Sequence, residues 1–227
     1  RVYIYKSSSP IVKPRLVSAE DVPLDQGGKV KLKWMRSGYD SKGLSSVTEY
    51  TIERSEAPGA DGYFYWEKIA SINANKNPAY AYTASTSYDS TSSSNALFKF
   101  RITAKTNNSD EYWRSNVVSG YSTDDISPDQ VQKFSGSPEN GDVVLTWEPN
   151  TEEDLWNYSL YRSTESEMNP DTASPIAVVT DTTYTDSNVP TGDHYYYIRA
   201  RDINENYGPL TETSNNPLPV ELSSFTA

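Results

Sequence analysis

The sequence predicts an all-β chain made of two tandem copies of one small β-sandwich domain. Two alternating segments that end at Trp34 and Trp147 are each followed by a Tyr-x-hydrophobic segment and later by a longer alternating one. The repeat unit is about a hundred residues, which is too long for a solenoid repeat and fits a whole domain. Aromatic residues make up 12% of the chain, with 18 Tyr, and no stretch shows a sustained helical apolar spacing.

Alternation of apolar and polar residues places the strands of both copies. In the first copy the late strand has the clearest pattern, because its outward positions Lys99, Arg101, Thr103 and Lys105 are all charged or hydroxyl-bearing. The inward residues expected at the two cores are Trp34, Tyr50, Ile52, Phe98, Phe100 and Ile102 in the first copy, and Trp147, Tyr158, Leu160, Tyr196 and Ile198 in the second.

Pro-rich and polar segments suggest the boundaries of the domains. We expect an N-terminal strand and linker at 1–12, the first domain at 13–122, a linker at 123–128, the second domain at 129–215, and a C-terminal linker with the strand of a following module at 216–227. The segments Arg1–Lys6 and Leu218–Ala227 both alternate as strands do, so we expect them to pair with sheet edges in this chain or in adjoining subunits.

The residues of both copies resemble the fibronectin type III family, an immunoglobulin-like sandwich. The second copy matches best, through Trp147-Glu148-Pro149-Asn150, Asp154-Leu155, Tyr158–Ser163, Thr183–Asp186, Gly192 and Ala200-Arg201-Asp202. In the first copy Trp34, Tyr50, Ile52 and Ala104 hold the corresponding places. The corner Tyr of the family falls at Phe98 and at His194, so the resemblance does not carry the usual corner hydrogen bond to either domain.

The segment Leu218–Ala227 carries a second resemblance. It looks like the opening strand of a module found near the C-termini of type IX secretion substrates in the Bacteroidetes–Ignavibacteria group of bacteria. The resemblance implies an extracellular or outer-cell-surface protein whose sorting domain lies downstream or has been removed.

Charge and cysteine content exclude several function classes. Lys and Arg number 20 against 31 Asp and Glu, which gives a formal net charge of −11. Such a chain repels phosphate backbones, so we expect no nucleic-acid partner. There is no Cys, which excludes disulfides, thiolate metal sites and Cys nucleophiles. No apolar run approaches membrane-spanning length, so we expect no membrane insertion.

We expect no catalytic residues. His194 is the single His, and its neighbours Asp193 and Tyr195 do not complete a Ser–His–Asp arrangement. Its position in the alternating pattern points it toward the edge of the core, in place of the corner Tyr. The chain is therefore predicted not to be an enzyme, although paired carboxylates on separate strands could not be recognised from the sequence.

Two short acidic runs are the candidate metal ligands. Asp124-Asp125 and Glu152-Glu153-Asp154 supply the hard oxygen ligands that calcium prefers. Neither run has the spacing of a calcium-binding EF-hand loop, and the simpler interpretation is a pair of solvated loops. We expect no cofactor, with calcium at the junction of the domains as the alternative.

Consecutive aromatic residues are the candidate ligand-binding residues. Tyr63, Phe64, Tyr65 and Trp66 lie on an expected strand, so one pair would face outward and could stack on sugar rings. Tyr112 and Trp113 offer a second such position. Alternatively these rings cover a sheet edge or contact a neighbouring domain, since Tyr and Trp are enriched at interfaces.

The sequence thus favours a non-catalytic structural spacer or interaction module of a secreted or cell-surface bacterial protein, in an extracellular assembly. Its partners would be neighbouring domains or subunits of that assembly. The first alternative is a carbohydrate- or protein-binding module that uses the exposed aromatics on a polysaccharide or protein. The second is an accessory region of a secreted hydrolase.

Overall fold

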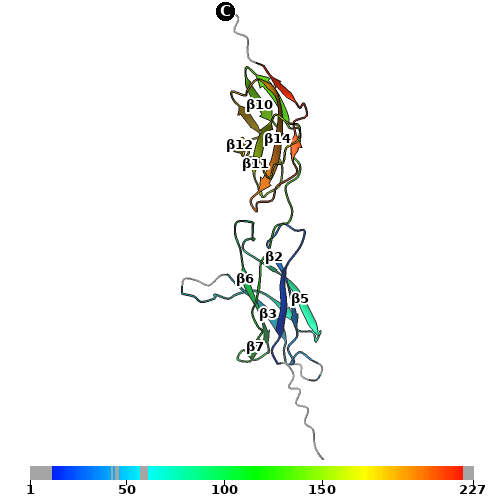
Figure 1. Cartoon of the computed structure of the whole chain (residues 1–227). Coiled ribbons are helices and arrows are strands. Elements are labelled where there is room, and N and C mark those ends of the chain that lie inside the picture. The colour runs from blue at the N-terminus through cyan, green and yellow to red at the C-terminus, as the bar shows by residue number, and fades with distance from the viewer. Residues whose placement is uncertain (1–11, 42, 44–45, 57–60, 222–227) are drawn as a thin grey trace, which may run out of the picture. The chain divides into compact units, whose positions relative to one another are not determined.

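The structure is a computed structural model that describes residues 12–41, 43, 46–56 and 61–221. These residues form strands, turns and loops (Figure 1), and none of them belongs to a helix that is long and apolar enough to cross a membrane. The chain divides into two compact units, Arg1–Asp125 and Ile126–Ala227, which we call the first and the second unit. The division falls inside the segment 123–128 that the sequence suggests as a linker.

The first unit contains two antiparallel sheets. The smaller sheet has the order β1-β2-β5, and the larger has the order β4-β3-β6-β7, with β8 also paired to β6. The strands are β1 (Arg15–Asp21), β2 (Lys29–Met35), β3 (Glu49–Ser55), β4 (Glu67–Asn73), β5 (Ala79–Ser85), β6 (Phe98–Lys105), β7 (Tyr112–Arg114) and β8 (Val118–Gly120).

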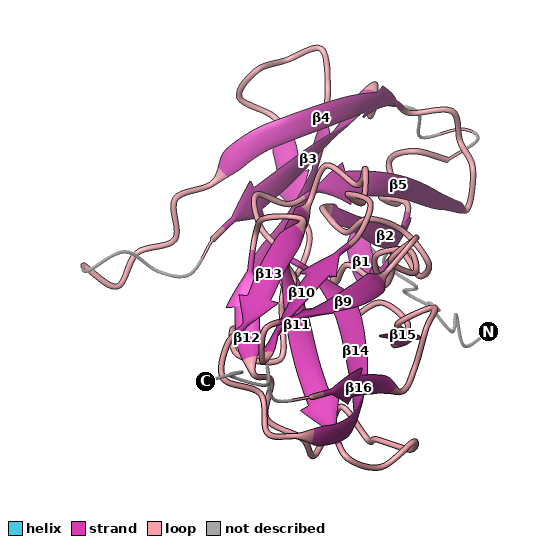
Figure 2. Cartoon of the chain, turned by 90° about the horizontal axis from the view of Figure 1, so that it is seen from above, coloured by secondary structure: helices cyan, strands magenta, loops and turns pink. Residues whose placement is uncertain are grey.

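The second unit repeats this arrangement. Its smaller sheet has the order β13-β10-β9, and its larger sheet has the order β12-β11-β14-β15, with β16 also paired to β14 (Figure 2). The strands are β9 (Ser135–Glu139), β10 (Asp142–Thr146), β11 (Leu155–Ser163), β12 (Ala177–Val179), β13 (Thr183–Asp186), β14 (Gly192–Asp202), β15 (Thr211–Glu212) and β16 (Leu218–Val220).

The strand order defines the fold class. In each unit the first, second and fifth strands form one sheet, and the third, fourth, sixth and later strands form the other. This is the connectivity of the fibronectin type III sandwich, in which two sheets of an immunoglobulin-like fold enclose one core. Both units are therefore fibronectin type III-like β-sandwiches, as the sequence predicts.

A buried Trp forms the centre of each core. In the first unit Trp34 is 1% exposed, stacks on Tyr80 at 5.6 Å between ring centroids, and meets Tyr50 edge-on at 5.9 Å. In the second unit Trp147 is 6% exposed and lies edge-on to Phe134 at 6.0 Å and to Tyr158 at 5.4 Å. Such edge-to-face and offset contacts are the preferred aromatic geometries. Each Trp joins the smaller sheet of its unit to the larger one.

The period-2 pattern matches the observed burial on the central strands. On β6 the four residues at the inward positions, Phe98, Phe100, Ile102 and Ala104, have no exposed surface. The outward residue Thr103 is also buried, and its hydroxyl donates a hydrogen bond to the Glu53 carboxylate on the outer face of the sheet. The remaining residues expected at the cores, Tyr50, Ile52, Tyr158, Leu160, Tyr196 and Ile198, are all at most 1% exposed.

The C-terminal strand differs from the expected domain boundary. Leu218–Val220, which we expected to open a following module, pairs as β16 with Gly192–His194 at the start of β14. Leu218 and Val220 are 2% and 3% exposed and belong to the core of the second unit. The expectation that this segment joins a sheet edge is confirmed for these three residues. Arg1–Lys6 and 222–227 lie outside the described residues.

Replacement of Trp34 or Trp147 by Ala should lower the free energy of unfolding of its own unit by about 3–5 kcal/mol, because a large buried ring leaves a cavity. Urea denaturation followed by circular dichroism would measure the loss. Trp156→Ala is a matched control, since Trp156 is 51% exposed and should cost less than about 1 kcal/mol. Equal losses at Trp147 and Trp156 would contradict the assigned core.

Leu218→Ala should destabilise the second unit by about 2–5 kcal/mol, because Leu218 fills the space above Gly136. A Cβ atom built on Gly136 would lie 2.2 Å from Leu218 Cδ1, which shows how closely the side chain packs there. The neighbouring Pro219 is exposed, and Pro219→Ala serves as the control. Thermal unfolding of both variants would show whether β16 belongs to this unit; a Leu218→Ala variant as stable as the control would show that it does not.

Candidate functional site

The outer face of the larger sheet of the first unit carries cations stacked on aromatic rings. On β6, the Arg101 guanidinium lies 4.0 Å from the centroid of the Trp66 ring, and Lys99 Nζ lies 5.1 Å from that of Phe64. Attraction between a cation and the electron-rich face of a ring stabilises such pairs. The alternation of β6 sends these side chains away from the core, so they cover the outside of the sheet.

Glu53 on β3 holds Arg101 in this position. Its carboxylate accepts hydrogen bonds from Arg101 Nε at 3.0 Å and Nη2 at 2.8 Å, and from Thr103 Oγ1 at 2.5 Å. Burial raises the pKa of the Glu53 carboxyl, but these hydrogen bonds and the Arg101 charge outweigh burial and lower the pKa below its ordinary value. The bidentate contact fixes the plane of the guanidinium beneath Trp66.

The expected strand at Tyr63–Trp66 is wrong, because the backbone there makes no ladder and β4 begins at Glu67. The side chains still alternate. Tyr63 and Tyr65 are 71% and 67% exposed, whereas Phe64 and Trp66 fold back over Lys99 and Arg101. Neither pair enters the core. The rings in contact with the sheet lie on its outer face, and the other two point to solvent.

In the second aromatic candidate, Tyr112-Trp113, one ring faces solvent and the other packs against the domain. Tyr112 on β7 is exposed and lies beside Arg114, 4.9 Å from its guanidinium carbon. Trp113 is half-buried, packs against Tyr39 at 4.6 Å between centroids, and contacts the core. Only Tyr112 is therefore free to meet a ligand, and Trp113 is a structural residue.

The second unit has a cation–aromatic face that the sequence analysis missed. Arg199 on β14 lies 3.8 Å from the ring centroid of Tyr207, and its Nε donates a hydrogen bond to the Tyr161 hydroxyl at 3.0 Å. Arg201 lies between Trp156 and the same Tyr207, at 4.9 and 5.1 Å. The alternation of β14 puts both Arg residues at outward positions, and this signal could have identified them. Their aromatic partners lie on other segments: Tyr161 and Trp156 on the neighbouring strand β11, and Tyr207 in the segment after β14, where it forms an isolated β-bridge with Arg201.

The acidic residues Asp124 and Asp125 belong to the first unit. Asp124 forms an isolated β-bridge with Gln26 and is buried. Asp125 Oδ2 accepts a hydrogen bond from the Leu24 N–H at 3.2 Å, and the Asp125 N–H donates to Asp25 O at 3.1 Å. These contacts attach the end of the first unit to the loop between β1 and β2.

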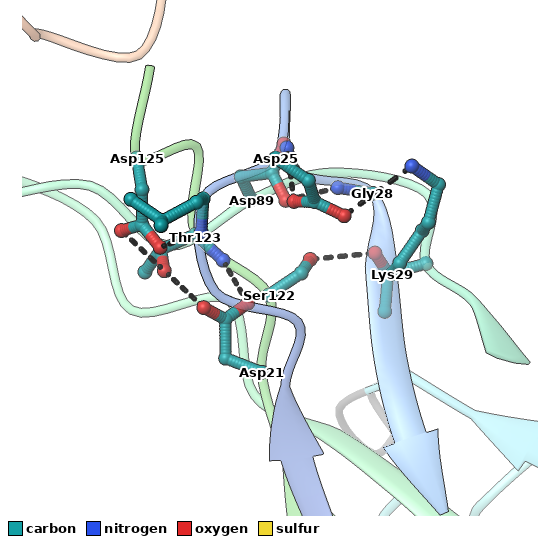
Figure 3. A network of polar contacts seen from close by, with 11 residues as sticks. Asp21, Asp25, Gly28, Lys29, Asp89, Ser122, Thr123 and Asp125 are labelled. Carbon is teal, nitrogen blue, oxygen red and sulfur yellow. Dashed lines mark hydrogen bonds and ion pairs between the residues drawn. The ribbon is translucent and has the colours of Figure 1, made fainter. Parts of the chain in front are cut away.

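Figure 3 shows that the chain just before these residues is fixed in the same way. The carboxylate of Asp21, at the end of β1, accepts hydrogen bonds from the Thr123 N–H at 2.9 Å and the Thr123 hydroxyl at 2.8 Å. Nearby, Asp89 Oδ1 accepts a hydrogen bond from the Gly28 N–H at 2.7 Å. A Cβ atom on Gly27 would lie 2.2 Å from Asp89 Oδ2, so there is no room for a side chain at this position. Gly27 also has φ +68°, so this turn requires glycine.

The run Glu152-Glu153-Asp154 does not act as one cluster. Glu152 borders a polar pocket of about 450 Å³, where its Oε1 accepts hydrogen bonds from the Asp129 N–H at 2.5 Å and from Asn150 Nδ2 at 3.2 Å. Burial raises the pKa of Glu152, but the backbone donors outweigh it and the net shift is downward. Glu153 is exposed, and Asp154 is half-buried immediately before β11.

His194 takes the place of the corner Tyr. It is buried, and its Nε2 lies 2.7 Å from the carbonyl oxygen of Pro190, four residues upstream. A corner Tyr makes the same kind of contact with its hydroxyl. In the first unit Phe98 has no such group and instead packs against Tyr88, at 4.9 Å between centroids. The single His is a structural residue at the edge of the core.

Each core also contains a carboxylate that binds tyrosine hydroxyls. In the first unit, buried Asp40 Oδ2 accepts hydrogen bonds from Tyr50 at 3.0 Å and Tyr80 at 2.6 Å. In the second unit, Asp186 Oδ2 accepts from Tyr196 at 2.8 Å and from Arg162 Nη1 at 2.7 Å. Burial, followed by the neighbouring carboxylate, raises the pKa of Tyr50 and of Tyr196 far above its ordinary value.

Comparisons with known proteins add little to this geometry. No protein-family model matches the chain, and no curated protein matches it significantly. Among solved structures, the FN1–FN3 domains of chicken CNTN1 are similar with a TM-score of 0.36 and 15% identity, over 91% of this chain and 68% of that chain. The assignment of both units to the fibronectin type III-like fold rests on their own strand order.

The buried tyrosines predict a loss of stability at alkaline pH. Tyr50 and Tyr196 ionise near pH 10 when unfolded but at higher pH when folded, so the folded state retains protons that the unfolded state has lost. The contribution of these two tyrosines to the free energy of unfolding is complete below pH 10 and declines as the pH rises further. Urea denaturation between pH 8 and 11 should show this decline, and the double variant Tyr50→Phe/Tyr196→Phe should show less of it. Titration of all 18 tyrosines near pH 10 in the folded protein would contradict the assignment.

Proposed function

We propose that the chain is a non-catalytic spacer and interaction module of a secreted or cell-surface bacterial protein, and that it works within an extracellular assembly. The observation that carries this proposal is the repetition of one complete sandwich with its own Trp-centred core. The larger sheet of each unit also has a cation–aromatic outer face beside exposed rings, such as Tyr65 in the first unit and Trp156 in the second. A spacer needs domains that are stable by themselves, and an interaction module needs accessible side chains with directional chemistry.

The spacer role is supported by how the first unit ends. Thr123 and Asp125 are bound by side-chain and backbone hydrogen bonds to the loop and strand that lie before β2. A chain held in this way leaves its domain from a fixed point instead of through a free tail. The secreted setting is supported by the likeness of Leu218–Ala227 to type IX secretion substrates, and the partners would be neighbouring domains or subunits.

Carbohydrate or protein binding is the second candidate, and the solvent-facing rings favour it. Tyr63 and Tyr65 project from the loop before β4, and Tyr112 projects from β7. Exposed aromatic rings stack on sugars and are enriched at protein interfaces. As a third candidate, an accessory region of a secreted hydrolase would use the same rings to hold a polymer near a separate catalytic domain.

Single-molecule stretching of the whole chain from its two ends tests the spacer role. Two independent sandwiches should give two separate unfolding events, each releasing roughly 300 Å of chain for about a hundred residues. Trp34→Ala should lower the force of one event only. A single event that releases both units together would argue against independent spacer domains.

Binding and turnover assays separate the three candidates. We expect the purified chain to hydrolyse neither glycosides nor peptides; turnover that one carboxylate substitution abolishes would overturn the non-catalytic assignment. A glycan array and pull-down with insoluble polysaccharides test binding. Retention that is lost in Tyr63→Ala/Tyr65→Ala but kept in Tyr121→Ala, an exposed ring elsewhere in the first unit, would favour the carbohydrate-binding candidate.

A further inference from the structure

Two carboxylates of the second unit meet at one end of its larger sheet. Asp154 immediately precedes β11, and Asp202 is the last residue of its antiparallel neighbour β14. The ladder pairs Leu155 with Asp202, and the Ile203 N–H donates to the Asp154 carbonyl oxygen at 3.0 Å. This register brings one carboxylate oxygen of Asp154 within 4.8 Å of one of Asp202.

Asp202 is the unusual member of the pair. Its side chain is 0% exposed, and its Oδ1 accepts a hydrogen bond from the Asn206 N–H at 2.8 Å. The other oxygen, Oδ2, has no hydrogen-bond donor within the described part of the chain. A buried carboxylate oxygen without a partner is costly, particularly beside a second carboxylate, and most such atoms in native proteins have a partner that satisfies them.

A calcium ion would supply that missing partner. Ca²⁺ binds carboxylate oxygens at 2.3–2.6 Å, so two oxygens on opposite sides of one ion are about 5 Å apart. The carboxylate oxygens of Asp154 and Asp202 lie within 4.8 Å of each other, so one ion could contact both. We propose that Asp154 and Asp202 are ligands of a calcium site in the second unit, with water completing the coordination shell.

The backbone at this end is organised well enough to hold an ion. The Asp202 N–H donates to Asn206 O at 3.1 Å, and the Gly208 N–H donates to Ala200 O at 3.0 Å, so the turn after β14 is closed on itself. Asp202 therefore has a fixed position without metal. A site with two carboxylates belongs to the weaker class of calcium sites, with an expected Kd of about 10⁻⁴–10⁻³ M.

The first unit provides an internal comparison. When Tyr50 is aligned with Tyr158 and Ala104 with Ala200, the positions of Asp154 and Asp202 fall on Ser46 and Thr106. Neither carries a charge, so the first unit lacks the pair of carboxylates. Calcium should stabilise the second unit and leave the unfolding of the first unchanged.

Calorimetric titration of the metal-free full chain with CaCl2, and thermal unfolding in CaCl2 or EDTA, test the proposal. A ligand at 100 times its Kd should raise the Tm of the second unit by about 10 °C. Asp154→Asn and Asp202→Asn should each weaken binding at least about 10-fold, because a neutral amide replaces a charged ligand. Asp193→Asn makes the same charge change at an exposed position of β14 and should bind like the unsubstituted chain.

The stability of Asp202→Asn in EDTA separates a metal ligand from a purely structural residue. If Asp202 serves to bind calcium, removal of its charge relieves repulsion from Asp154, and the variant should be at least as stable as the unsubstituted chain without metal. A clear loss of stability in EDTA would show a structural role and overturn the proposal. It would also be overturned by the absence of heat and Tm shift at 10 mM Ca²⁺, or by equal weakening in Asp193→Asn.

Discussion

Both sandwiches depend on one constraint, which is that a Trp at the end of the second strand or directly after it must be enclosed between two sheets. Trp34 and Trp147 are too large to be covered by their own sheets, so each is buried only when an aromatic residue of the facing sheet, Tyr50 or Tyr158, closes over it. Burial of such rings removes more apolar surface from water than that of any other side chain. The inward positions of the neighbouring strands, and hence the strand register, follow from this packing.

The outer faces follow from the same register. Inward and outward positions alternate along a strand, so the residues between the apolar core residues of β6 and β14 lie on the outer face of the sheet. These outward residues include Lys99, Arg101, Arg199 and Arg201. There the cations find rings from other segments, which shield the stems of the long side chains and hold their charged ends. The outer faces of the larger sheets therefore carry Lys and Arg side chains packed against aromatic rings, in a chain whose net charge is strongly negative.

Where the sequence analysis failed, nonlocal contacts explain the failure. The alternation at Tyr63–Trp66 mimics a strand, but two of its rings are held by Lys99 and Arg101 on β6, and the backbone has no neighbouring strand to pair with. Leu218–Val220 reads as the beginning of another module, yet the edge of β14 and the space above Gly136 place it in the second unit. In both cases the local pattern is compatible with more than one partner.

The sequence by itself determined the all-β class, the two-fold repeat and the inward residues of the central strands, because these depend on a period-2 pattern that each strand carries within itself. It also marked His194 as a core-edge residue. Only the tertiary structure decided which residues lie together: Arg201 with Trp156 and Tyr207, Tyr196 with Asp186, and Asp202 with Asp154. The physical reason is that each pair joins separate strands or loops, so its two members meet only through the strand register, which is fixed by the packing of the whole core.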